Sequence, residues 1–432
     1  MSRPVGPRLV RKPNGADPRP PTPRSELNAV TSNPRNSSAA TQPELPSARQ
    51  TIPLDVLAND TRVVPLRSMG ATVIDLFAGC GGMTAGFLAS NRDFRTVAAV
   101  EWDLAAAATY AANFGEAHTH WIDIADFKDV PKADVVMGGP PCQGFSNLGS
   151  RDPADPRNKL WMEYVRVVLA ANPQTFVLEN VDRFSKSSEF GLLMSELENG
   201  RLKKWKHHTW AVLNAADYGV PQRRQRTILI ASRVGPIALP EPTHSKDGHG
   251  GLDPWSGVRT AIEGLPYMPS TTDLPDTTTN FFGQRLRGTF KMSEIHFGRN
   301  PNPVSLERYD CVPPGGGRFD LPDHLLPRCW AEKASGTTDV MGRMRWDTPS
   351  LTIRTEFFKP EKGRYLHPQW DPDVPALRVN RVITHQEAAL IQTFPQDFLW
   401  VGSKTEIARQ IGNAVPSRLA EAIARSVSDR LR

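Results

Sequence analysis

The sequence is poor in cysteine, and its four cysteines form no C-x-x-C pair. They stand at positions 80, 142, 311 and 329 of 432, a spacing that argues against a disulfide framework or a structural zinc site. We therefore expect no metal. No apolar run approaches the length that crosses a bilayer, and the N-terminus has no apolar signal segment. These absences predict a soluble, cytoplasmic protein without a membrane partner.

Aromatic residues are absent from the first fifty positions, which are rich in Pro, Ser, Asn and Arg. Such a segment cannot bury enough apolar surface to offset the entropy lost on ordering. We predict that residues 1–68 form a disordered basic tail. The first fifty residues hold eight Lys and Arg against three Asp and Glu, and so carry five of the six net positive charges. A DNA-binding role must therefore rest on local residues rather than on overall charge.

From residue 71 the sequence alternates between short apolar runs and helical segments. Strands are expected at 72–77, 96–100, 118–122, 135–137, 175–178 and 227–231, and helices at 83–90, 104–114, 160–171, 384–394 and 417–431. This alternation predicts an α/β fold with a doubly wound, mostly parallel sheet. Residues 245–381 are rich in Pro, Gly, Thr and Arg with little helical periodicity, and predict a smaller irregular domain.

A glycine-rich turn, Gly79-Cys-Gly-Gly82, follows the first expected strand. Its glycines allow close approach of a ligand, and the next helix offers free N–H groups, although the turn is not the GxGxxG fingerprint. Glu101 lies 19 residues beyond Gly82, where a carboxylate can accept both ribose hydroxyls. Asp123 could accept from an adenine amino group or could cap a helix. The first half therefore indicates a site for an adenosine-containing cofactor.

Cys142 begins a loop at the edge where a parallel sheet opens its binding crevice. Gly138-Gly-Pro-Pro141 ends the preceding strand, and Gly144 leaves room on the other side of the cysteine. A thiol held in this way suits a nucleophile. A lone free cysteine is as often a small buried apolar residue, so Cys142 alone leaves both interpretations open.

Five motifs then occur in order along residues 70–432. They are Asp75-Leu-Phe-Ala-Gly-Cys-Gly-Gly82, Gly139-Pro-Pro-Cys-Gln-Gly-Phe-Ser146, Glu179-Asn-Val181, Gln222-Arg-Arg-Gln-Arg226 and Gln410-Ile-Gly-Asn-Ala-Val-Pro416. Together they resemble the motif set of the cytosine-5 DNA methyltransferases, and their order argues against coincidence. The resemblance implies methylation of carbon 5 of a flipped-out cytosine in double-stranded DNA, with S-adenosyl-L-methionine as donor.

The resemblance also implies a division of the chain and roles for four residues. It places a catalytic and cofactor domain at 69–244, a target-recognition domain at 245–381, and a C-terminal return to the catalytic domain at 382–432. The four residues are the nucleophile Cys142, the carboxylate Glu179 at ring nitrogen 3, Arg226 at the exocyclic oxygen, and Arg224 behind the nucleophile loop. Burial at a strand end would raise the pKa of Glu179 and favour its protonated form.

The other site residues are expected in these motifs, at the ends of the second and third strands, and in the inserted region. The cofactor is expected against Asp75, Phe77, Gly79, Gly81, Gly82, Glu101, Trp102, Asp123, Ile124, Pro140, Asn413 and Val415. DNA contacts are expected from Gln143, Ser146, Gln222, Gln284, Arg285 and Arg287. Gln and Arg can read base edges in the major groove, although for each of the last three residues taken alone a place in an irregular surface loop is the stronger interpretation.

Three alternatives belong to other functional classes. One branch of the family methylates a transfer-RNA cytosine, but the size of the recognition region favours DNA. A non-catalytic protein with this fold is opposed by the set Cys142, Glu179 and Arg226. An amino-group methyltransferase needs an acidic or Asn-Pro-Pro-aromatic loop where this chain has Gly-Pro-Pro-Cys. The compact length indicates an enzyme of a prokaryotic restriction–modification system, with a restriction endonuclease as a genetic partner only. We expect a monomer, since flipping one base needs one active site.

Overall fold

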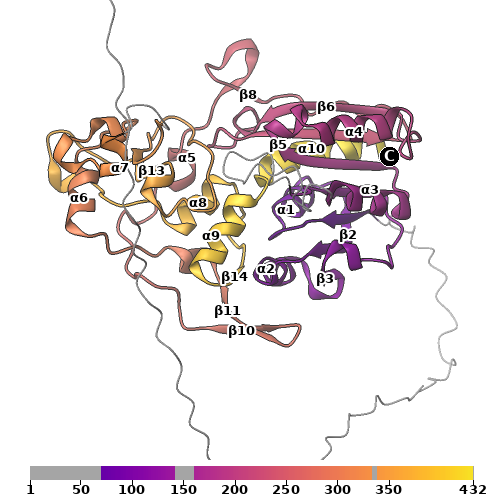
Figure 1. The fold of residues 1–432 in the computed structure, drawn as a ribbon, viewed down its shortest axis with the longest axis horizontal. Coiled ribbons are helices and arrows are strands. Elements are labelled where there is room, and N and C mark those ends of the chain that lie inside the picture. The colour runs from indigo at the N-terminus through magenta and orange to yellow at the C-terminus, as the bar shows by residue number, and fades with distance from the viewer. Residues whose placement is uncertain (1–69, 142–159, 333–337, 432) are drawn as a thin grey trace, which may run out of the picture. The chain divides into compact units, whose positions relative to one another are not determined.

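A seven-stranded sheet is the centre of the computed structural model, which describes residues 70–141, 160–332 and 338–431 apart from the side chains of Cys329 and Ala331. Within the compact unit Leu66–Arg432, the strand order is β3-β2-β1-β4-β5-β7-β6 (Figure 1). The strands are β1 (Ala71–Leu76), β2 (Phe94–Glu101), β3 (Thr119–Trp121), β4 (Val135–Gly138), β5 (Thr175–Val181), β6 (His207–Asn214) and β7 (Gln225–Ser232).

Adjacent strands from β3 to β5 are parallel, whereas β7 runs antiparallel to both of its neighbours. The connection from β6 to β7 is short and holds one 3₁₀ turn, Ala215–Tyr218. A connection without a crossover helix returns the chain antiparallel. The expected α/β fold with a mostly parallel sheet is confirmed.

Helices cover both faces of this sheet. They are α1 (Gly82–Ala89), α2 (Leu104–Phe114), α3 (Leu160–Ala171), α4 (Ser188–Glu198) and α10 (Ser417–Leu431), whereas α9 (Lys404–Asn413) packs in the core of the inserted region. Side chains alternate along a strand, so Ile74 and Val136 pack with α3 and α4, while Val73 and Met137 pack with α1 and α10 on the opposite face. The C-terminal helix therefore completes the sheet's covering, next to α1.

Three of these elements were not expected from the sequence, namely α4, α9 and β6. The helix α4 begins at the N-cap Ser187, whose hydroxyl accepts the N–H of Phe190 at 3.1 Å; this capping signal is present in the sequence. β6 is an edge strand, and its residues are mostly half-buried on both faces. The apolar alternation that identifies a half-buried strand is therefore weak in β6.

The inserted region has many short elements, as the sequence predicts. They are β8 (His244–Ser245), β9 (Asp253–Pro254), α5 (Arg259–Ile262), β10 (Thr278–Phe281), β11 (Gln284–Phe290), α6 (Pro303–Asp310), α7 (Arg328–Ala331), β12 (Gly342–Arg343) and β13 (Arg364–Leu366), followed by α8 (His385–Ile391) and β14 (Trp400–Val401). Ile262 and Phe290 share one hydrophobic core with Ile391 of α8 and Ile407 of α9. The division at 245 and 382 stays a prediction.

Among the described residues, no helix is both long enough and apolar enough to cross a membrane.

The contact between α1 and α10 generates a prediction on stability. A Cβ at Gly86 would lie 2.3 Å from the backbone oxygen of Ser417 and 2.5 Å from the Cβ of Ala420. Gly86→Ala should lower the free energy of unfolding by about 1–3 kcal/mol, because overpacking displaces the two helices. Urea unfolding measures this change.

Gly191 in α4 provides the matched control, because a Cβ there meets no atom within 4 Å. Gly191→Ala should raise the free energy of unfolding by about 0.5–1 kcal/mol through helix propensity alone. Equal effects of the two substitutions would contradict the close packing of α1 on α10.

Candidate functional site

The turn between β1 and α1 is held in an uncommon backbone conformation. Phe77, Gly79 and Gly81 have φ angles of 55°, 56° and 92°, and a non-glycine residue such as Phe77 is strained at a positive φ. A Cβ at Gly81 would lie 2.2 Å from the Phe114 ring, whereas a Cβ at Gly79 would meet no atom within 4 Å. The turn is thus packed against α2 on one side and faces open space at Gly79.

Glu101, the last residue of β2, holds this turn from the neighbouring strand. Its Oε2 accepts the N–H of Gly79 and its Oε1 accepts the N–H of Asp103, both at 2.8 Å. Burial raises the pKa of Glu101, and these backbone N–H groups lower it by less. Each carboxylate oxygen has a second acceptor site, which leaves the group able to accept hydroxyls of a ligand.

Asp75 lies beneath the turn rather than beside open space. It is buried in β1, and its Oδ2 accepts the hydroxyl of Thr84 at 2.7 Å. That hydroxyl lies 2.9 Å from the hydroxyl of Tyr110 in α2. Burial raises the pKa of Asp75 to about 7. Asp75 therefore fixes α1 and α2 relative to β1, in a role that the sequence did not reveal.

An aromatic and acidic rim follows β2 and β3 at the same edge of the sheet. Trp102 is 74% exposed, and its carbonyl accepts the indole N–H of Trp121 at 3.0 Å. Asp123 is exposed and caps the 3₁₀ turn Ile124–Asp126 through the N–H of Ala125 at 2.8 Å. The helix-cap interpretation of Asp123 is thus confirmed, and Ile124 is buried.

The segment between α9 and α10 closes on the turn from the other side. A Cβ at Gly82 would lie 2.6 Å from the carbonyl oxygen of Val415. Val415 is buried and Asn413 is exposed at the end of α9. Residues more than 300 positions apart therefore meet at this edge, as the sequence motifs predict.

A second group of residues surrounds the end of β4. Gly138 pairs with Leu76 and Leu178 on the flanking strands, and the carbonyl of Pro140 accepts the Nδ2 of Asn180 at 2.8 Å. The chain is thereby held as it leaves the sheet. Cys142, Gln143 and Ser146 follow immediately and lie outside the described residues.

Glu179 and Arg226 form an ion pair directly beside this exit. Arg226 Nε lies 2.8 Å from Glu179 Oε1, and the two side chains are only 13% and 12% exposed. A Cβ at Gly139 would lie 2.7 Å from Glu179 Oε2. The second carboxylate oxygen of Glu179 therefore faces the backbone that leads to Cys142, and only a glycine fits between them.

Burial has a direct electrostatic consequence at this pair. It raises the pKa of Glu179, and the charges of Arg226 and Arg224 lower that pKa by less. The expected direction for Glu179 is confirmed. The carboxyl can consequently hold a proton at a pH where an exposed glutamate is ionised.

A group of buried polar side chains, here called the buried polar joint, connects this pair to the segment at the end of α9. Arg224 is fully buried and donates to the carbonyls of Ile353 at 3.0 Å and Gly412 at 2.8 Å. Gln222 is 0% exposed; its Nε2 donates to Gln392 Oε1 at 2.8 Å and its Oε1 accepts the N–H of Ile353 at 2.9 Å. In this conformation Gln222 is an interior residue and presents no surface to DNA.

Gln392 is a member of this joint that the sequence analysis missed. It is fully buried, and its Nε2 donates to the carbonyl of Ile411 at 2.6 Å, just before the segment Asn413–Val415. The available signal was a polar residue on the apolar face of the expected helix 384–394. The joint ties the strand of Arg226 to the segment that closes on the glycine-rich turn.

The remaining predicted residues lie on the hairpin β10–β11. Gln284 and Arg285 are exposed. Arg287 is engaged in contacts within the protein, since it lies 3.5 Å from Asp273 in an ion pair and donates to the carbonyl of Leu274 at 3.2 Å.

Cys80, in the glycine-rich turn, is buried, and that burial raises the pKa of its thiol. The raised pKa argues against a role as thiolate.

Comparisons with known proteins agree on one family. The family model described as C-5 cytosine-specific DNA methylase matches residues 71–429. The Type II methyltransferase M1.HphI of Haemophilus parahaemolyticus is 33% identical over 372 residues, covering 83% of this chain and 87% of the relative. The Type II methylase M.HgiDII of Herpetosiphon aurantiacus is 30% identical over 376 residues, covering 83% and 95%.

Solved structures agree on the fold. The methyltransferase EhMeth of Entamoeba histolytica has a TM-score of 0.54 at 18% identity, over 84% of this chain and 99% of that one. A proposed DNA modification methyltransferase encoded within an E. coli prophage has a TM-score of 0.59 at 24% identity, with the same coverage.

The buried carboxyl of Asp75 predicts a pH dependence of stability. Its ordinary pKa is 3.8 and its pKa in the folded protein is about 7, so folding disfavours ionisation. The free energy of unfolding should fall as the pH rises from about 4 to about 7, by up to about 4 kcal/mol, and then stay level. Asp75→Asn should lack this fall, which denaturant unfolding across that pH range measures.

Asp134 offers a control of opposite sign. Partial burial raises its pKa, but hydrogen bonds from Thr72 and Gln174 lower it by more. Its contribution to stability is present at neutral pH and is lost as the pH falls through its lowered pKa. An Asp75→Asn variant with the same pH slope as the unaltered protein would show that this carboxyl does not titrate as described.

Proposed function

The chain belongs to the family of C-5 cytosine-specific DNA methylases, and from this membership we propose how its residues perform the reaction. The protein is a DNA (cytosine-5-)-methyltransferase. One observation supports the assignment of roles above all others. The buried pair of Glu179 and Arg226 faces the backbone at Gly139, three residues before Cys142.

Cys142 is the nucleophile in this proposal. Carbon 5 of cytosine is too electron-poor to take a methyl cation directly. Addition of the Cys142 thiolate to carbon 6 turns the ring into an enamine and makes carbon 5 nucleophilic. After methylation, loss of the carbon 5 proton and departure of the thiolate restore the aromatic ring. The thiolate is the reactive form, so the reaction needs the Cys142 proton to leave before or during attack.

Glu179 supplies the proton or strong hydrogen bond at ring nitrogen 3 that the addition requires. Burial raises its pKa, which suits a group that must hold a proton near neutral pH. Arg226 orients this carboxyl through the 2.8 Å contact and donates to the exocyclic oxygen of the base. Arg224 and Gln222 position the strand that carries Arg226 through the hydrogen bonds of the buried polar joint.

S-adenosyl-L-methionine fits the residues around the glycine-rich turn. Glu101 retains acceptor sites for ribose hydroxyls, Trp102 exposes an aromatic face, and the space at Gly79 is open. When bound, this molecule supplies the methyl group. We place it against the turn of Phe77 to Gly82, the rim of Trp102, Asp123 and Ile124, Pro140, and the segment with Asn413 and Val415. Asp75 supports that site from below.

The substrate is double-stranded DNA, from which the target base is flipped out at a cost of a few kcal/mol. The inserted region 245–381 is the candidate for sequence recognition, with Gln284 and Arg285 as exposed readers, and Gln143 and Ser146 follow the nucleophile. Several relatives bear Type II names, which supports a role as a modification enzyme whose restriction endonuclease is a genetic partner. We propose a monomer that acts in the cytoplasm.

A substitution at Glu179 tests the catalytic assignment. Glu179→Gln cannot deliver a proton, so kcat should fall about 10²–10⁴-fold, measured as methyl transfer from S-adenosylmethionine to plasmid DNA. In the unaltered protein kcat/KM should decline as the pH rises through the raised pKa of Glu179. The variant should lose that decline.

Glu198→Gln is the matched control, because Glu198 is exposed on α4. It should keep full activity and an unchanged pH profile. Activity of Glu179→Gln within about threefold of the unaltered protein would remove Glu179 from the mechanism, since general acid catalysis contributes at least about 10²-fold.

A further inference from the structure

The hairpin β10–β11 extends from the inserted region to the large sheet's helix α2 (Figure 1). Its turn has φ angles of 47° at Phe282 and 74° at Gly283, the left-handed pair that tight two-residue hairpin turns require. At its base β11 pairs with β14 through Gly288 and Phe290. The hairpin is thus fixed at its base and carries two neighbouring phenylalanines at its tip.

Only one of these phenylalanines docks on α2. Phe281 is 4% exposed and packs with Ala107 and Ala108 of α2 and with Val401 of β14, while Trp121 lies against the same cluster. Phe282 is 52% exposed. Phe281 is therefore the anchor of the hairpin tip. Phe282 lies edge-on to the Phe281 ring, with ring centroids 4.7 Å apart, but does not belong to the cluster on α2.

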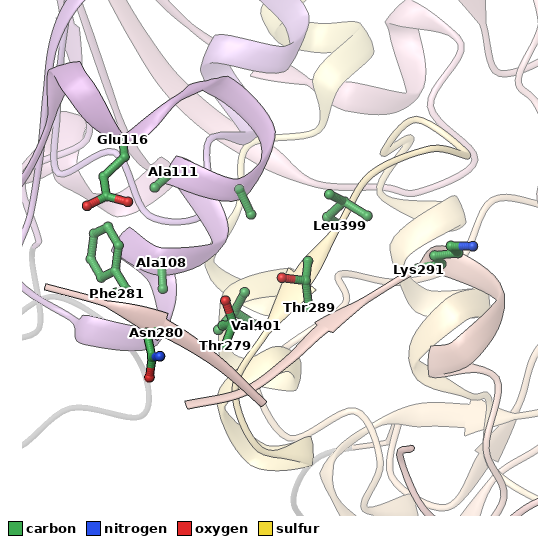
Figure 2. A pocket seen from close by; sticks show the side chains of 11 residues that line it. Ala108, Ala111, Glu116, Thr279, Asn280, Phe281, Thr289, Lys291, Leu399 and Val401 are labelled. Atoms are coloured by element: carbon green, nitrogen blue, oxygen red, sulfur yellow. The ribbon is translucent and has the colours of Figure 1, made fainter. Parts of the chain in front are cut away.

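The hairpin depends on this anchor because it does not lie flat on α2. A cleft of about 400 Å³ separates them, with Ala111 and Ala112 on the helix and Thr279 and Asn280 on the hairpin among its walls. Figure 2 shows Phe281 over Ala108 near one end of this cleft. Contact at the tip consequently rests largely on the ring of Phe281.

Trp121, which packs against the same cluster, leads to the proposed cofactor side of the sheet. Trp121 ends β3, pairs with Glu101 of β2, and donates its indole N–H to the carbonyl of Trp102 at 3.0 Å. Glu101 in turn holds the glycine-rich turn through Gly79. The cluster that contains Phe281 is therefore connected through Trp121 to Trp102 and Glu101.

We propose that Phe281 is a positioning residue for S-adenosylmethionine, through which the inserted region supports the adenosine side of the cofactor site. The inference rests on the proposed function, since it takes Glu101 and Trp102 as cofactor contacts. Removing the Phe281 ring opens the cluster against which Trp121 packs, and so loosens the contact of Trp121 with the carbonyl of Trp102. In this proposal the hairpin helps to hold the cofactor site in shape. That role is separate from the reading of bases by Gln284 and Arg285.

The test compares Phe281→Ala with Phe282→Ala in the full chain. Binding of S-adenosylhomocysteine is measured by calorimetry without DNA, so that the readout does not depend on catalysis. Phe281→Ala should raise the Kd about tenfold and the KM for S-adenosylmethionine in step, with kcat within about twofold. Phe282→Ala should stay within about twofold in Kd. Phe281→Leu, which restores apolar volume, should recover most of the affinity.

Two further variants separate the possible failures. Glu101→Ala reports on the cofactor site itself; if it binds S-adenosylhomocysteine normally, the proposed site is wrong. If Glu101→Ala binds weakly while Phe281→Ala binds like the unaltered protein, the site stands and the role of Phe281 is overturned.

Trp121→Phe keeps the ring packing but removes the indole N–H, and should weaken binding of S-adenosylhomocysteine about threefold. Should Phe281→Ala fail to fold, unchanged binding by Trp121→Phe overturns the proposal.

Discussion

Glu179 and Arg226 face each other in the interior at the carboxyl edge of the sheet, and the rest of the site is built to keep them there. Arg226 lies on β7, and the segment leading into β7 is tied through Arg224 and Gln222 to the inserted region and to the end of α9. Removing one partner of a buried ion pair leaves an uncompensated charge at a cost of about 3–5 kcal/mol. The pair therefore constrains both the chemistry and the packing of the segments around it.

The same edge of the sheet joins two sites that we assign to different molecules. Glu101, at the end of β2, accepts a hydrogen bond from the glycine-rich turn. Glu179, on β5, pairs with Arg226 beside the backbone that leads to Cys142. The joint around Gln392 links them, because the segment after Ile411 closes on Gly82. A movement of the inserted region would consequently shift residues at both sites. This coupling suits a reaction that brings a base and a methyl donor together.

Local patterns in the sequence predict the strands and most large helices, because buried parallel strands are short apolar runs bounded by Gly, Pro or Asp. They also place Glu101 correctly at the end of its strand, whereas Glu179, expected at a strand end, lies within β5, which continues to Val181. The roles of Gln222 and Gln392 could not be read, since their hydrogen bond joins residues 170 positions apart. The burial of Asp75 and its hydrogen bond from Thr84 also could not be read from its motif. The docking of Phe281, beside the exposed Phe282, likewise depends on tertiary contacts that no local pattern encodes.

The most direct test of the account is a base-by-base map of methylated cytosines in plasmid DNA incubated with the purified protein and S-adenosylmethionine, with Cys142→Ala in parallel. The account predicts methyl groups on carbon 5 of one cytosine within one short recurring sequence, and none with Cys142→Ala. Methylation that persists in Cys142→Ala, or that falls on an exocyclic amino group, would contradict the covalent mechanism centred on Cys142 and Glu179.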